Sequence, residues 1–147
     1  MADVLNLVGK KYPATESYLV GREKIREFAR SIFAEDPLHF DLDAALAAGY
    51  ADLVAPTTFA MVVQVRALEQ FLSDPEANID LSRVVHGDQR FSYQRPIVAG
   101  DELSGIFTVH AVRKLGANFM VSAEVNIVDQ AGQSVVNCLS TLMIGGE

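Results

Sequence analysis

The strict alternation of residue type over residues 117–128 is the sequence feature that most constrains the fold. Apolar side chains occupy every odd position, whereas the even positions are mostly polar. The odd positions are Phe119, Val121, Ala123, Val125 and Ile127. A period of two matches a β-strand, whose successive side chains point to opposite faces. One apolar face indicates an antiparallel strand that is half buried.

Further runs in the second half of the chain predict neighbouring strands. With the first, the expected strands cover residues 90–94, 103–113, 117–128 and 135–143. Pro96 ends the earliest run, and turns are expected at Gly100-Asp101 and over residues 129–132. Long strands joined by short turns predict an antiparallel meander.

The first half of the chain has helical periodicity. From Arg22 onward, apolar residues recur at the spacing of one helix face. They are Ile25, Phe28, Ala29, Ile32 and Phe33. This helix is expected to stop near Asp36-Pro37, because the residue before a proline avoids the helical conformation. A second, shorter helix is expected over residues 43–48, closed by Gly49.

The most informative helix is predicted to begin at Pro56, since proline suits the first helical turn. Apolar residues then surround the helix axis almost completely. They are Phe59, Met61, Val62, Val63 and Val65. A helix that is apolar all round is buried, so we expect this one inside the fold. It becomes amphipathic only from Arg66 and should end near Asp74-Pro75.

A buried helix followed by long antiparallel strands has one economical packing, in which the sheet curls around the helix. The predicted class is therefore α+β, with a hot-dog fold. The length of 147 residues fits one domain over residues 1–147. The edges of such a sheet are commonly covered by dimerisation.

Composition excludes several classes of function. A formal net charge of −7 argues against nucleic acid, which needs a basic face. The single cysteine, Cys138, fits a reducing cytoplasm, and no apolar run is long enough to suggest a membrane span. The three histidines lie too far apart for a metal motif, and no glycine-rich phosphate loop occurs. We expect a cytoplasmic protein without metal or cofactor.

Five segments together resemble the MaoC-like hydratase family. They are residues 21–29, 36–41, 55–59, 85–91 and 95–101. The likeness extends from about Gly21 to Ile144, and it is greatest to the branch of the A and C subunits of mycobacterial (3R)-hydroxyacyl-ACP dehydratase. The resemblance implies interconversion of (R)-3-hydroxyacyl and trans-2-enoyl thioesters, with acyl-CoA or acyl-ACP as substrate. This chemistry needs two positioned acid/base groups.

The family's pattern is an Asp, four residues and a His, and this chain matches it in part. His39 falls on the His, whereas Ala34 stands at the position of the Asp. Glu35 and Asp36 offer carboxylates displaced by one or two residues. The catalytic candidates are therefore His39, Asp36 and Glu35. A loop histidine that caps Asp36 or Asp41, and a turn role for Asp36, are the simpler interpretations.

The resemblance also places substrate-binding candidates. The N–H groups of Thr57 and Thr58, after Pro56, would face the thioester oxygen, although simple capping needs the same residues. Tyr50 would wall the acyl tunnel or merely pack, and His86 would line the pantetheine entrance or form a turn. Met61, with Val62 and Val65, would form an acyl channel.

The leading hypothesis is a dehydratase or hydratase subunit that supplies acyl-chain binding with an incomplete catalytic dyad. It would be a homodimer, or a heterodimer with a subunit that has the complete Asp-x4-His dyad. Two alternatives stay open. One is a non-catalytic acyl-thioester binding module, and the other is a hot-dog thioesterase that uses Asp36 or Glu35.

Overall fold

The computed structural model describes residues 3–146 and contains three α-helices and five strands within them. The helices are α1 (Arg22–Ser31), α2 (Leu42–Ala47) and α3 (Met61–Leu72). The strands are β1 (Tyr18–Leu19), β2 (Val84–Tyr93), β3 (Glu102–Leu115), β4 (Asn118–Val128) and β5 (Ser134–Ile144). Four 3₁₀ turns join them: η1 (Val4–Leu7), η2 (Pro37–His39), η3 (Thr57–Ala60) and η4 (Leu81–Arg83).

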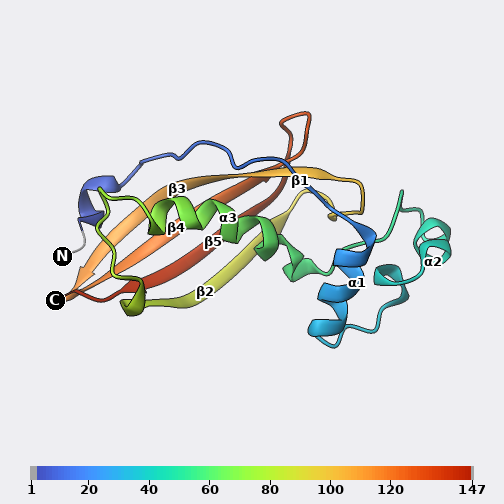
Figure 1. The fold of residues 1–147 in the computed structure, drawn as a ribbon, viewed down its shortest axis with the longest axis horizontal. Coiled ribbons are helices and arrows are strands. Elements are labelled where there is room, and N and C mark those ends of the chain that lie inside the picture. Colours follow the sequence, from blue (N-terminus) through green and yellow to red (C-terminus); the bar gives the residue numbers. More distant parts are fainter. Residues whose placement is uncertain (1–2, 147) are drawn as a thin grey trace.

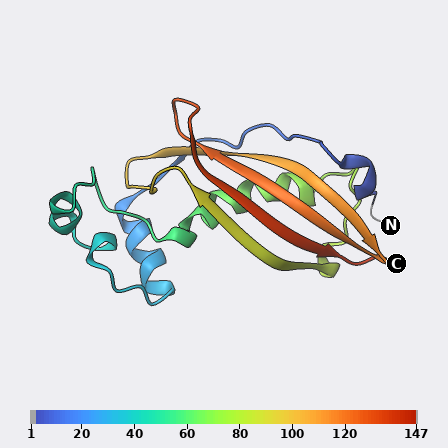
Figure 2. The same cartoon turned by 180° about the vertical axis from the view of Figure 1, so that it is seen from behind.

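The strands form one antiparallel sheet in the order β1-β3-β4-β5-β2. The short β1 and the long β2 are its two edges. The sheet curls around α3, as Figure 1 and the reverse view in Figure 2 show. This is the hot-dog fold, so the predicted α+β class is confirmed.

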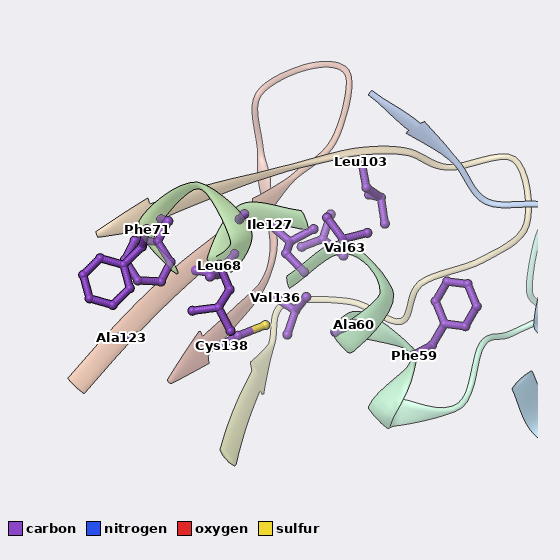
Figure 3. Close-up of a cluster of buried hydrophobic side chains, with 14 of the residues drawn as sticks. Phe59, Ala60, Val63, Leu68, Phe71, Leu103, Ala123, Ile127, Val136 and Cys138 are labelled. Carbon is purple, nitrogen blue, oxygen red and sulfur yellow. The ribbon is translucent and has the colours of Figure 1, made fainter. Parts of the chain in front are cut away.

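The core lies between α3 and the concave face of the sheet (Figure 3). Phe71 of α3 stacks on Phe107 of β3 with ring centroids 5.1 Å apart, and neither side chain is exposed. Gly105 of β3 lets α3 lie close to the sheet, because a Cβ at this position would be only 3.1 Å from the Cβ of Ala67 in α3. In β4, the apolar residues at odd positions are buried and those at even positions are not, as the sequence predicted.

The N-terminal segment runs beside β3. The N–H groups of Gly9 and Tyr12 donate to the carbonyls of Val109 and Phe107, at 2.8 and 2.9 Å. Asp74, just beyond α3, accepts hydrogen bonds from the Tyr12 hydroxyl at 2.6 Å and from Lys10 Nζ at 2.7 Å. We call these three side chains the Asp74 clamp; they fasten the N-terminal segment to the end of α3.

Helix α1 ends earlier than the sequence predicted. It begins at Arg22 as expected but stops at Ser31 instead of near Asp36. The N–H of Phe33 donates to the Arg30 carbonyl and that of Ala34 to the Ala29 carbonyl, which is a Schellman ending. Phe33 occupies the left-handed position of this motif, with φ of 58°, where glycine is usual.

The prediction that the helix after Pro56 is buried all round is wrong. Its first turn is the 3₁₀ turn η3, and Val65 is 41% exposed on α3. The sheet covers only one side of a helix, so the opposite side meets solvent. Within residues 3–146, every helix is too short or too polar to cross a lipid bilayer.

Candidate functional site

Residues 21–55 form a helical lobe that extends beyond one end of the sheet, with α1 and α2 inside it (Figure 1). A pocket of about 680 Å³ lies between this lobe, the first turn of η3 and the end of β2. Several predicted site residues meet in it, although they are distant in sequence. They are Asp36, His39, Tyr50, Pro56 and Thr57.

His39 is half-buried in the pocket wall, and its orientation is fixed by the backbone. Its Nδ1 lies 2.6 Å from the carbonyl oxygen of Val54. A carbonyl only accepts hydrogen bonds, so Nδ1 bears the proton and Nε2 of the neutral ring keeps a free lone pair. The ring therefore does not cap Asp36 or Asp41, and Nε2 can take up a proton.

The carboxylates near His39 have other surroundings. Asp36 lines the pocket, but its Oδ1 accepts a hydrogen bond from the Leu38 N–H at 3.0 Å and caps η2. The simpler turn role of Asp36 is therefore present in the structure. Glu35 is exposed and is not among the described residues that line the pocket. Ala34 does line it and brings no carboxylate.

The first turn of η3 forms the floor of the pocket. Pro56 and Thr57 line it, whereas Thr58 is exposed outside it. The Tyr93 hydroxyl, from the end of β2, donates to the Thr57 carbonyl, and burial raises the pKa of this phenol. The first N–H groups of a helix have no partner within it, so this turn can donate to an oxygen in the pocket.

Besides Thr58, two more of the predicted substrate-binding residues lie away from the pocket. Met61 is half-buried in α3 and is not among the described lining residues. His86 lies within β2, where the turn expected before the strand is instead a bulge between His86 and Asp88. Its Nε2 is 3.1 Å from the Asp88 carbonyl, and it stands roughly 23 Å along the strand from Tyr93.

The structure adds residues to which the sequence assigned no role. Tyr93, Arg95 and Ile32 line the pocket. Arg95 is held by a bidentate pair with Asp101, at 2.9 and 3.0 Å, so its charge is already balanced. The period-two pattern of residues 90–94 could have placed Tyr93 on the inner face of the sheet. The meeting of this face with η3 was not visible in the sequence.

The amino-acid sequence matches the family described as "FAS1-like, dehydratase domain region" over residues 6–138. The chain belongs to this FAS1-like dehydratase-region family. Among curated relatives, a UPF0336 protein of Leifsonia xyli subsp. xyli is 58% identical over 141 residues, covering 96% of this chain and 95% of the relative.

Two solved structures extend the comparison. One chain of the C-terminally truncated HadBC (3R-hydroxyacyl-ACP dehydratase) complex from Mycobacterium tuberculosis matches with 31% identity and a TM-score of 0.84; the match covers 93% of this chain and 96% of that chain. A MaoC-like dehydratase matches with 31% identity and a TM-score of 0.85; the match covers 95% of this chain and 42% of that chain. The predicted MaoC-like relationship is confirmed, and this FAS1-like chain is homologous to hot-dog hydratases and dehydratases.

Proposed function

We propose that the chain is a subunit of an (R)-specific 3-hydroxyacyl thioester dehydratase or hydratase. It supplies an acyl-thioester pocket and one half of the catalytic dyad. One observation supports this most strongly: His39 is held by the Val54 carbonyl in a pocket where Ala34 takes the place of the expected Asp. The substrate is an acyl-CoA or acyl-ACP, and the chemistry needs no cofactor.

The pocket suggests a placement for each part of the thioester. Its carbonyl oxygen would accept from the N–H group of Thr57, which lines the pocket at the start of the helix, where the helix dipole favours negative charge. The reacting carbons would then lie beside Nε2 of His39, with Tyr50 on the wall of the lobe. In hydration, Nε2 takes a proton from water as the oxygen attacks C3. A second group must protonate C2; the partner's Asp in its protonated form would give this proton, and the proton held on Nε2 would then pass to the resulting carboxylate, which restores both groups.

The edge of the sheet supports a two-subunit enzyme. Strand β2 pairs with β5 on one side and is the last strand on the other. Val85, on this edge, is 62% exposed. Unpaired edges readily take a strand from another chain. HadBC is itself a complex. We infer that β2 faces a second hot-dog chain, which has the complete Asp-x4-His dyad.

A second function is favoured by the same alanine. With Ala34 at the expected position of the Asp and Glu35 exposed, the chain could bind an acyl thioester without any chemistry. A binding module and a catalytic subunit differ in one respect. Only the subunit raises the turnover of a partner, and only there does His39 matter for the rate.

Hydration of crotonyl-CoA tests the proposal. We expect no turnover by the purified chain alone and turnover after co-expression with a homologous chain that has the complete dyad. In a complex whose partner has the His of its own dyad replaced by Ala, His39→Ala in this chain should lower the remaining rate about 10²- to 10⁴-fold, the usual contribution of a positioned acid/base group. Ala34→Asp should give the isolated chain measurable activity, since it adds the missing carboxylate.

The alternatives give different results. Turnover by the wild-type chain alone that disappears in His39→Ala would contradict the incomplete dyad. Binding of butyryl-CoA without any effect of His39→Ala on a partner's turnover would identify a binding module. Release of free thiol from acyl-CoA would indicate a thioesterase instead.

A further inference from the structure

Two side-chain contacts close the seam between the helix and the edge strand β2, directly behind the pocket. The seam is the line along which residues 57–72 face β2. At the pocket, the Tyr93 hydroxyl donates to the Thr57 carbonyl. Further along, the side-chain amides of Gln64 and Gln89 bond reciprocally at 2.9 and 2.8 Å. Gln89 and Tyr93 share one face of β2, because strand side chains alternate.

The glutamine pair resists opening. Gln64 is only 1% exposed and lies among mostly apolar side chains. Its side-chain amide both donates to and accepts from the amide of Gln89. A ligand that displaced Gln89 would leave the buried side-chain amide of Gln64 without a hydrogen-bond partner, at the full desolvation cost of that group. An acyl chain brings no hydrogen-bonding group to replace the lost partner.

Phe91 lies on β2 between the Tyr93 contact and the Gln89 contact, next to the Tyr93 ring. Their ring centroids are 6.3 Å apart, and both rings are half-buried on the inner face of β2. Burial raises the pKa of the Tyr93 phenol, so its hydroxyl stays protonated and continues to donate. The inner end of the pocket is therefore an aromatic wall fastened to the backbone of η3.

The interior behind this wall is already packed. The side chains there are at most 1% exposed: Phe59, Ala60, Val63, Val136 and Cys138. Among the described residues, those that line the pocket include none from α3, β3, β4 or β5. The pocket thus ends at Tyr93 and Thr57, and Met61 and Val65 are not among the described residues that line it.

We propose that Tyr93, supported by the Gln64–Gln89 pair, limits this pocket to short acyl groups. The inference rests on the proposed thioester binding and names the substrate class of that site. A long acyl chain would have to break both contacts or remain outside in water. Tyr93 is then the residue that determines chain length.

Binding of saturated acyl-CoA measures this without any chemistry, because butyryl-CoA and dodecanoyl-CoA cannot be hydrated. By isothermal titration calorimetry, the wild-type chain should bind butyryl-CoA at least about tenfold tighter than dodecanoyl-CoA, the size of a typical steric mismatch. Equal or tighter binding of dodecanoyl-CoA would overturn the proposal. Binding of neither by the folded protein would overturn thioester binding itself, and this inference with it.

Variants then locate the wall. Tyr93→Ala should shift the ratio of the two affinities about fivefold or more towards dodecanoyl-CoA, whatever it does to binding of the shared CoA thioester group. Tyr93→Phe, which keeps the ring and removes only the contact to Thr57, should act in the same direction with a smaller effect. Tyr50→Ala is the matched control, since Tyr50 lines the pocket at the lobe and its loss should change both affinities alike. An unchanged ratio in both folded Tyr93 variants would contradict the assignment.

Discussion

The helical lobe and the sheet with α3 are held together by different forces. The sheet and α3 share a core of fully buried apolar side chains, among them Phe71 and Phe107. The lobe has fewer buried side chains and depends on polar contacts. Arg22 and Asp52 form a bidentate ion pair at 2.9 and 2.8 Å, and Asp36 and Asp41 cap its short helices.

This difference separates stability from function. Apolar burial contributes most to folding free energy, whereas exposed ion pairs and single caps contribute little each. Yet the lobe supplies His39, Tyr50 and the Val54 carbonyl to the pocket. Substitutions in the core should therefore change stability strongly, and those in the lobe should change the site with small effects on stability.

The largest effect is expected from Phe107→Ala. The ring stacks on Phe71 and meets Tyr12 edge-on at 5.6 Å, so its removal leaves a cavity in the centre of the core. The expected loss is about 3–5 kcal/mol in the free energy of unfolding. Urea denaturation followed by circular dichroism measures it. A loss below about 1 kcal/mol would show that the core collapses around the missing ring.

A smaller effect is expected at the Asp74 clamp. Asp74→Asn weakens the charge-assisted hydrogen bonds from Lys10 and Tyr12. We expect a loss of about 1–2 kcal/mol, seen as a drop of roughly 3–6 °C in Tm. Glu76→Gln is the matched control, because Glu76 also pairs with Lys10 but its side chain is 71% exposed. An equal drop in both variants would contradict a special role of Asp74.

The same clamp should make stability depend on pH in acid. Hydrogen bonds from Lys10, and then from Tyr12, lower the pKa of Asp74 to about 2 in the folded state. The unfolded value is about 3.9, so the stabilisation is present above pH 4 and is lost as pH falls towards 2. The difference in urea midpoint between wild type and Asp74→Asn should shrink over this interval. A difference that stays constant down to pH 2 would exclude the linkage.

Phe33→Gly should stabilise the lobe. A left-handed conformation costs a non-glycine residue roughly 1–2 kcal/mol, while glycine loses about 0.5–1 kcal/mol more backbone entropy on folding. The ring is 90% exposed, so little burial is lost. A net gain of about 0.5–1 kcal/mol should raise Tm by roughly 2–4 °C. Phe33→Ala keeps the strained Cβ and should bring no gain; an equal rise in both variants would contradict backbone strain as the cause.

Phe33 also marks a feature that the sequence did not predict, the early end of helix α1. The pattern up to Phe33 is helical, and only hydrogen bonds to Ala29 and Arg30 reveal that the helix has already stopped. The strict alternation of β4 predicted its buried face because period two depends on local geometry alone. The pocket depends on contacts between distant segments, such as His39 with Val54 and Tyr93 with Thr57, which no local pattern encodes. The resemblance supplied His39 and Thr57, but it assigned no role to Tyr93.

The smallest change in stability is expected from Asp36→Ala, which should have a clear effect on the site. Asp36 caps η2, the turn that ends at His39, and loss of such a cap costs about 0.5–1 kcal/mol. Asp80→Ala is the matched control, because Asp80 caps η4 through the Ser82 N–H at 3.0 Å. The turn η4 precedes the first residue of β2, whereas Tyr93 and the pocket are at the last residue of that strand.

Both variants should lower Tm by a small amount, and Asp80→Ala by somewhat more, because Asp80 also accepts from the Ser82 hydroxyl at 2.7 Å and pairs with Arg83 at 3.6 Å. Only Asp36→Ala should weaken butyryl-CoA binding by the isolated chain or slow crotonyl-CoA hydration by the complex, since only η2 holds the imidazole against Val54. Equal losses of binding and turnover in the two variants would mean that general loosening controls the site. Loss in Asp36→Ala alone would show that Asp36, which lines the pocket and caps the turn that ends at His39, controls the site while adding little to the stability of the fold.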